Sequence, residues 1–162
     1  MRIHLMLTGG TIDKLYNPLK GELGFTQTHI PAALEQGRCG VDLEVQQLCL
    51  KDSLEMTDQD RAQILEACRN SPHQQIVITH GTDTMAETAR YLIAANPNKT
   101  IVLTGAMIPL SVNGSDGLFN LGSALVAVQT LSTGVYIAMN GRGFNGAQVT
   151  KNRVLGVFEA LH

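Results

Sequence analysis

Two short polar stretches of the chain carry residues that could do chemistry. Thr8–Ile12 (TGGTI) follows the apolar run Ile3–Leu7, and Thr79–Thr84 (THGTDT) follows the run Gln75–Ile78. Each stretch places hydroxyl groups and glycines at the carboxyl end of a β-rich run, which is where open α/β sheets bind their ligands. Glycine permits the sharp turns and the close approach of backbone to ligand that such a site needs.

A threonine hydroxyl is a weak nucleophile at neutral pH and needs a base beside it. Three side chains are candidates for that base: Tyr16, Asp83 and Lys151. A lysine acts as a base only when it is neutral, which requires burial or a neighbouring cation. From its polar neighbours alone Lys151 has the pattern of a surface lysine, and Thr82 or Thr84 has the pattern of a helix cap. Both interpretations stay open at this stage.

The composition limits the class of protein. The length of 162 residues suits one domain, and 44% hydrophobic with 16% charged residues indicates a folded chain. A net charge of −2 without a Lys/Arg block argues against a nucleic-acid partner. The apolar runs are too short to span a bilayer, and the N-terminus has no signal-peptide pattern. We therefore expect a cytoplasmic protein with no membrane partner.

Neither a metal nor a cofactor is predicted. The five histidines are scattered, and none has a second ligand at helical metal spacing. His80 is expected to be a hydrogen-bonded structural residue. The stretch Thr8–Ile12 does not fit the glycine patterns that cradle phosphates. Three cysteines, an odd number without metal spacing, indicate reduced thiols: Cys39, Cys49 and Cys68.

Strands and helices are predicted to alternate along the chain. Strands are expected over 2–7, 41–48, 75–79, 100–104 and 134–139, and helices over 29–36, 57–70, 83–95 and 118–131. Thr57 and Asp60 resemble a capping box, and Asp116 or Ser115 can cap the last helix. Residues 8–28, which include Tyr16, and residues 141–146 are expected to be loops. Strands that are apolar on both faces predict an α/β fold, a single domain over 1–162 with a mostly parallel sheet and helices on both faces.

Several segments resemble the L-asparaginase (asparaginase/glutaminase) family. They follow the family's order: Thr8–Ile12, Asp52–Thr57, Ile78–Ala89, Thr104–Pro109, Ser115–Leu121 and Val149–Lys151. The resemblance implies the fold of the family's N-terminal domain, in a short-chain form that lacks the C-terminal domain. It also implies hydrolysis of L-asparagine through a covalent acyl-enzyme. From Leu54, the missing second domain and the greater length of the glutamine side chain, we expect little glutaminase activity. No cofactor is implied, and a homo-oligomer, a dimer or tetramer, is expected.

The resemblance also assigns roles to single residues. Thr11 matches the nucleophile, and Tyr16 matches the loop tyrosine that partners it. Thr82, Asp83 and Lys151 match the second triad, in which Asp83 also holds the substrate's α-amino group. Ser53 matches a contact to the substrate carboxylate, and Leu54 stands where the family often has glutamine. The backbone of the glycine-rich turns, at Gly10, Gly81 and Thr82, is expected to contribute to substrate binding and to supply donors for the oxyanion.

Two functions of other classes compete with the hydrolase. One is an amino-acid-binding module that keeps the pocket without the chemistry. The other is an amidotransferase subunit that passes ammonia to an RNA-bound substrate, although such subunits normally carry further domains. A binding module has no need of Thr11, Thr82 and Lys151 together, so the sequence favours the enzyme.

Overall fold

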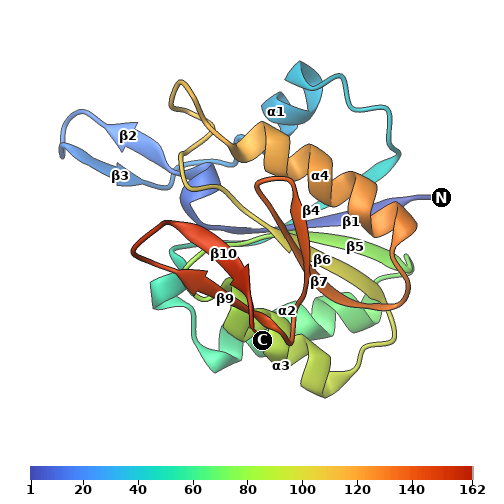
Figure 1. Ribbon diagram of the computed structural model, residues 1–162. Helices are drawn as coiled ribbons and strands as arrows, with labels where there is room; N and C mark the ends of the chain where they lie inside the picture. The colour runs from blue at the N-terminus through green and yellow to red at the C-terminus, as the bar shows by residue number, and fades with distance from the viewer. Residues whose placement is uncertain (162) are drawn as a thin grey trace.

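A six-stranded sheet runs through the middle of the computed structural model, which describes residues 1–161 (Figure 1). Five strands are parallel and the last is antiparallel. In spatial order the strands are β4 (Leu43–Lys51), β1 (Ile3–Gly9), β5 (Gln75–Thr79), β6 (Thr100–Thr104), β7 (Gly134–Met139) and β8 (Arg142–Asn145). The predicted α/β fold with a mostly parallel sheet is confirmed.

Helices cover both faces of this sheet. One face packs against α1 (Ile30–Gln36) and α4 (Gly117–Thr130), and the other against α2 (Asp58–Asn70) and α3 (Met85–Ala95). Every residue of β1 and β6 is buried, which explains why these strands read as continuous apolar runs. The connection through α4 runs in the same direction as that through α3 but over the opposite face, so the two crossovers have opposite hands.

Helix α2 begins with the predicted capping box. Asp60 N–H donates to Thr57 Oγ1 (3.3 Å), and Thr57 N–H donates back to Asp60 Oδ2 (2.8 Å). The Lys51 ammonium also lies 2.7 Å from Asp60 Oδ1. The Lys51 contact, together with the Thr57 N–H, lowers the pKa of Asp60 to about 2. This carboxylate therefore joins the end of β4 to the start of α2.

We expect Asp60→Asn to lower stability by about 2 kcal/mol at most near neutral pH, the equivalent of the pKa depression. Because the folded pKa is below the ordinary value of 3.8, the stabilisation is present above that value and is lost as the pH falls toward 2. Urea unfolding of parent and variant between pH 7 and pH 2 measures the difference. Glu35→Gln, at an exposed position in α1, is the control. A gap between parent and Asp60→Asn that stays constant with pH would contradict this account.

The expected loop over residues 8–28 contains more regular secondary structure than predicted. It contains a 3-10 turn at Thr11–Asp13 and a hairpin of β2 (Leu15–Asn17) and β3 (Glu22–Gly24). The Asn17 side chain accepts the N–H groups of Leu19 and Lys20, which closes the hairpin turn. Strands of three residues are too short to show an alternating pattern. In Figure 1 the hairpin projects from the body of the molecule.

The expected loop over 141–146 is also partly a strand. Residues Arg142–Asn145 form β8, which pairs with β7 from Met139 to Tyr136. A second hairpin follows, made of β9 (Val149–Asn152) and β10 (Val157–Ala160). Val149 and Phe158 of this hairpin are buried in the core that α2 and α3 also line. This packing fixes Lys151 relative to the sheet, because Lys151 follows Val149 by two residues and lies opposite Phe158 in the pairing register.

Candidate active site

Three of the predicted segments meet at the carboxyl ends of the central strands. A Cβ added to Gly10 would lie 2.4 Å from Gly81 N, and a Cβ added to Gly81 would lie 2.5 Å from Ser53 Oγ. Gly10 also has φ +80°, a conformation that side chains rarely adopt. The connections after β1 and β5 leave toward opposite edges of the sheet, so this junction is the switch point where such folds bind ligands.

The predicted second triad is assembled at this junction. Lys151 Nζ donates to Thr82 Oγ1 at 2.7 Å and to Asp83 Oδ1 at 2.8 Å. The Lys151 side chain is only 14% exposed, so Lys151 is not the surface lysine that its neighbours in sequence indicated. Residues almost 70 positions apart in the chain are thus brought within one hydrogen-bond network.

Thr11 lies at the first position of the 3-10 turn that follows Gly10. Its side chain is half-buried, and its hydroxyl has no hydrogen-bond partner within residues 1–161. Buried Asp13 anchors the turn by accepting the Thr28 hydroxyl (3.0 Å) and the His29 N–H (2.7 Å). Burial raises the pKa of Asp13 despite these hydrogen bonds. The turn is therefore held by the segment just before α1, and the Thr11 hydroxyl remains available to a ligand.

Sequence and structure comparisons identify the family of the chain. The family model for the asparaginase N-terminal domain matches residues 2–158. This chain belongs to the asparaginase family.

L-asparaginase 1 of Escherichia coli K12 is 35% identical to this chain over 171 residues, and the match covers 98% of the chain and 49% of that protein. The L-asparaginase of Thermococcus kodakarensis is 31% identical over 97% of the chain and 49% of its own length. The solved structure of the thermostable L-asparaginase from that organism superposes with a TM-score of 0.87, at 29% identity, over 99% of this chain and 51% of that one. The chain spans about half the length of the curated relatives it matches.

Threonines around the asparaginase-like junction hold its backbone. Thr8 Oγ1 donates to the Thr79 carbonyl (2.7 Å), which joins the ends of β1 and β5. Thr84 occupies the N-cap position of α3, but its Oγ1 donates to the Ser53 carbonyl (2.9 Å) and makes no capping hydrogen bond. Thr82 is engaged by Lys151 instead, so neither threonine caps the helix with its side chain. The buried Ser53 is held directly against Gly81 by these contacts.

His80 is a structural residue, as the sequence predicted. Its Nδ1 lies 2.7 Å from the Gly81 carbonyl and its Nε2 lies 2.8 Å from Thr88 Oγ1, so both ring nitrogens have partners. Complete burial lowers the pKa of His80 to about 4, which keeps the ring neutral at physiological pH. His80 therefore shapes the turn before Thr82 and has no nitrogen available for a substrate.

Asp116 organises the neighbouring loop, a role that sequence reasoning missed. Its carboxylate accepts the N–H groups of Met107 and Ile108 and the side-chain amides of Asn120 and Asn140. Although burial raises the pKa of Asp116, these donors keep it below its ordinary value. Asp116 does not cap α4 with its side chain. Ser115 Oγ instead accepts the Gly117 N–H at 2.9 Å. Both residues lie in the family segment Ser115–Leu121.

Two further charged contacts were not predicted. Lys14 pairs with Asp52, and Arg153 Nη2 lies 3.4 Å from the Asp83 carbonyl. Lys14 lowers the pKa of Asp52. The sequence gives no sign of either contact, because Lys14 and Arg153 are far along the chain from their partners and only the fold brings them together.

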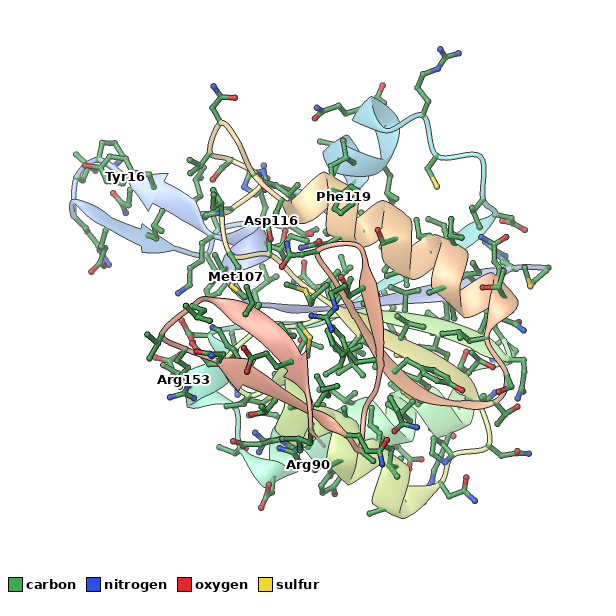
Figure 2. The ribbon with its side chains drawn as sticks, viewed as in Figure 1. Tyr16, Arg90, Met107, Asp116, Phe119 and Arg153 are labelled. Carbon is green, nitrogen blue, oxygen red and sulfur yellow. The ribbon has the colours of Figure 1, made fainter. Side chains whose placement is uncertain are left out.

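Tyr16 and Leu54 are the predicted site residues that the junction does not enclose. Tyr16 is 56% exposed on the projecting hairpin, and its hydroxyl has no hydrogen-bond partner within residues 1–161 (Figure 2). It lines a cavity of about 310 Å³ together with Phe25 and other hairpin residues. Leu54 is 64% exposed, next to the buried Ser53. A role for either side chain therefore requires a substrate or a movement of the hairpin.

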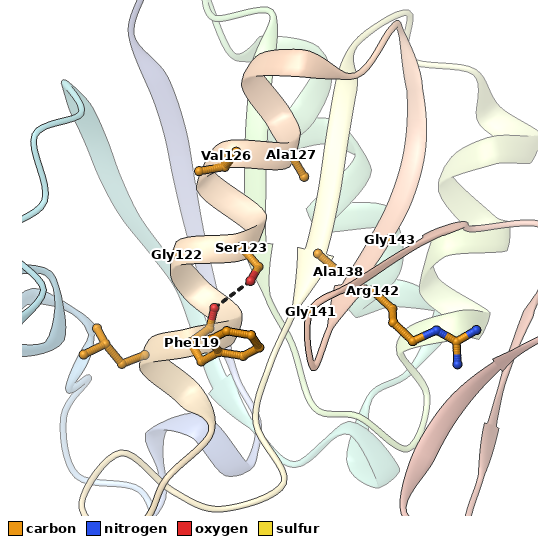
Figure 3. Close-up of a pocket in the computed structure, with 10 residues that line it drawn as sticks. Phe119, Gly122, Ser123, Val126, Ala127, Ala138, Gly141, Arg142 and Gly143 are labelled. Atoms are coloured by element: carbon orange, nitrogen blue, oxygen red, sulfur yellow. Dashed lines mark hydrogen bonds between the residues drawn. The ribbon is translucent and has the colours of Figure 1, made fainter.

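A larger cavity of about 600 Å³ lies away from these residues, between α4 and the β7–β8 turn (Figure 3). Phe119, Val126 and Ala138 give it a mainly apolar lining. None of the predicted site residues contributes to it.

The histidine, cysteine and acidic side chains of residues 1–161 do not gather in any group of three or more that could hold a metal ion. Among the helices of the same residues, none has the length and apolar character needed to cross a membrane.

Proposed function

We propose that the chain hydrolyses L-asparagine to L-aspartate and ammonia. The observation that carries the proposal is the Lys151–Thr82–Asp83 network beside the Gly10–Gly81 contact. This arrangement places an amine on one threonine hydroxyl while a second threonine, Thr11, stands one residue from the same contact. Membership of the asparaginase family supports the choice of an amide substrate.

In the first half of the proposed reaction, Thr11 Oγ attacks the side-chain amide carbon of asparagine. The hydroxyl proton leaves Thr11 for a base, and the carbonyl oxygen becomes an oxyanion that takes backbone N–H donors of the glycine-rich turns. The C–N bond then breaks, and the nitrogen leaves as ammonia after it receives a proton. An aspartyl ester on Thr11 remains.

In the second half, water attacks this ester, and aspartate and the free Thr11 hydroxyl are released. Thr82 and Lys151 are suited to move the proton, because the neutral amine accepts it from a hydroxyl 2.7 Å away. Asp83 holds the ammonium of Lys151 and, in the proposal, the α-amino group of the substrate. Tyr16 partners Thr11 when its hairpin closes over the substrate, and Ser53 receives the α-carboxylate.

We expect hydrolysis of glutamine to be much slower than that of asparagine, because the longer side chain needs more contacts to reach a reactive geometry. Leu54 can neither donate nor accept a hydrogen bond at the position where a glutamine is common in the family. Leu54→Gln is expected to improve kcat/KM for asparagine by up to about tenfold, the equivalent of one hydrogen bond. Ammonia release from both amides, by parent and variant, gives the ratio of kcat/KM for asparagine to that for glutamine in each protein.

The control for this comparison is Leu131→Gln, which makes the same change just after α4, at a distance in sequence from every site segment. Equal kcat/KM for the two amides in the parent would overturn the expected preference for asparagine over glutamine. Absence of ammonia release from asparagine would overturn the proposed function itself.

We also propose that the protein is cytoplasmic and forms a homo-oligomer. A probable cytoplasmic L-asparaginase of Campylobacter jejuni superposes with a TM-score of 0.82 at 29% identity, over 98% of this chain and 52% of that one. A probable periplasmic L-asparaginase of Haemophilus influenzae is 29% identical over 96% of the chain and 47% of its own length. Cell fractionation distinguishes the two compartments, and light scattering of the purified chain gives the oligomeric state.

A further inference from the structure

Charged side chains alternate in sign around the candidate site. Lys14 contacts Asp52, Lys151 contacts Asp83 at 2.8 Å, and Arg153 Nε lies 3.8 Å from the same Asp83 oxygen. Each carboxylate thus has a cation of its own: Lys14 contacts Asp52, and Lys151 contacts Asp83.

Asp52 and Asp83 border the same junction. Asp52 precedes Ser53, and the Ser53 carbonyl accepts the hydroxyl of Thr84, the residue after Asp83. The charge of Lys151 also acts on Asp52 and contributes, after Lys14, to lowering the pKa of that carboxyl. Asp52 therefore lies beside the segment that carries Thr82 and Asp83, the two partners of Lys151, because its neighbour Ser53 packs against Gly81 and accepts the Thr84 hydroxyl.

We propose that Lys14 is a positioning residue whose ammonium occupies Asp52 and thereby leaves Lys151 to Thr82 and Asp83. This inference rests on the proposed function, in which Lys151 must give up its proton to act as a base. Nothing in the reaction requires Lys14 to contact the substrate.

The contacts of Asp52 explain why Lys14 is needed. Asp52 Oδ1 accepts the Leu54 N–H at 3.0 Å, and Oδ2 is taken by Lys14. The Asp52 side chain is only 30% exposed, so water alone screens its charge poorly. Without Lys14, this carboxylate would attract the ammonium of Lys151. That attraction favours the charged form of the amine, which is the form that cannot accept a proton.

The other charges near Lys151 do not replace Lys14. Arg153 faces Asp83 rather than Asp52. On the paired strand, the residue opposite Lys151 is the uncharged Phe158, and the adjacent Glu159 contacts Asn152. Lys14 is thus the cation that contacts Asp52 within the described part of the chain.

The test compares Lys14→Met with the double variant Lys14→Met/Asp52→Asn. The single variant leaves the carboxylate without its cation. We expect it to lower kcat for asparagine by about tenfold and to move the acid limb of the pH profile to higher pH. The double variant removes the carboxylate as well and should recover most of the kcat and the parent pH profile. Lys14→Arg keeps the cation and should stay close to the parent.

A chemical readout tests the same inference without turnover. Acetic anhydride reacts with neutral amines, and mass spectrometry gives the labelling rate of Lys151 relative to the exposed Lys20. We expect Lys14→Met to slow the labelling of Lys151 by roughly threefold relative to that of Lys20, because an uncompensated Asp52 carboxylate favours the charged amine. The double variant should label at the parent rate.

Two outcomes overturn the inference. One is parent-like labelling of Lys151 in Lys14→Met. The other is a double variant whose kcat is as low as that of the single variant, because removal of the Asp52 carboxylate should leave Lys151 to Thr82 and Asp83 again. If Lys14→Met does not fold, the Lys151 labelling and the kcat of Lys14→Arg and of the double variant, both expected to match the parent, still test the inference. If Lys151 of the parent is labelled but the parent releases no ammonia, the proposed function is contradicted. The role of Lys14 is then decided by the labelling rates alone.

Discussion

Replacing Thr11 with alanine is expected to lower the rate of ammonia release from asparagine by at least about a thousandfold. The variant lacks the oxygen that forms the acyl-enzyme, and no other residue of the 3-10 turn carries a hydroxyl. Thr82→Val should cause a loss of the same order, because it removes the hydroxyl that lies 2.7 Å from Lys151 Nζ while it keeps the shape of the side chain.

The controls separate chemistry from folding. Thr11→Ser retains a hydroxyl and should keep measurable turnover, and Thr130→Ala changes an exposed threonine in the last turn of α4. Thermal unfolding of all four variants should resemble that of the parent. Near-normal ammonia release from Thr11→Ala would overturn the assignment of the nucleophile.

Replacing Lys151 with methionine should lower kcat by at least about a hundredfold, the usual contribution of a positioned base. Methionine nearly matches the length of lysine but can neither accept nor donate the proton. In the parent, activity should fall as the pH decreases, because protonation of the amine removes its lone pair. Ammonia release measured across the pH range tests both expectations.

Lys151→Arg keeps a cation that does not lose its proton, and it should be as inactive as Lys151→Met. Lys20→Met, at an exposed position of the β2–β3 turn, is the matched control. Full activity in Lys151→Met would show that Lys151 only neutralises Asp83.

The parts of the fold that the sequence predicts well are those buried on both sides. The bounds of β5, β6 and β7 agree with the expected ranges, because helices cover both faces of these strands and leave unbroken apolar runs. The hairpin strands β2, β3, β9 and β10 have only three or four residues each. Their pairing depends on turn contacts, such as those of Asn17 and Asn152, that no hydrophobic period reveals.

The residues of the candidate site also differ in how far the sequence predicts them. The segments after β1 and β5 were predictable from glycines and hydroxyls at strand ends. The partnership of Lys151 with Thr82 came from the family resemblance, because its neighbours in sequence indicated a surface residue. Lys14, Arg153 and Asp116 were missed as contributors, since their partners lie on other elements and only the folded chain brings them together.

The most direct test of the proposed chemistry is to find the acyl group. Acid quenching of the purified chain during turnover of asparagine, followed by peptide mass spectrometry, locates any aspartyl ester. The account predicts this ester on the peptide that contains Thr11 and its absence from Thr11→Ala. An ester on the Thr82 peptide, with none on the Thr11 peptide, would contradict the account.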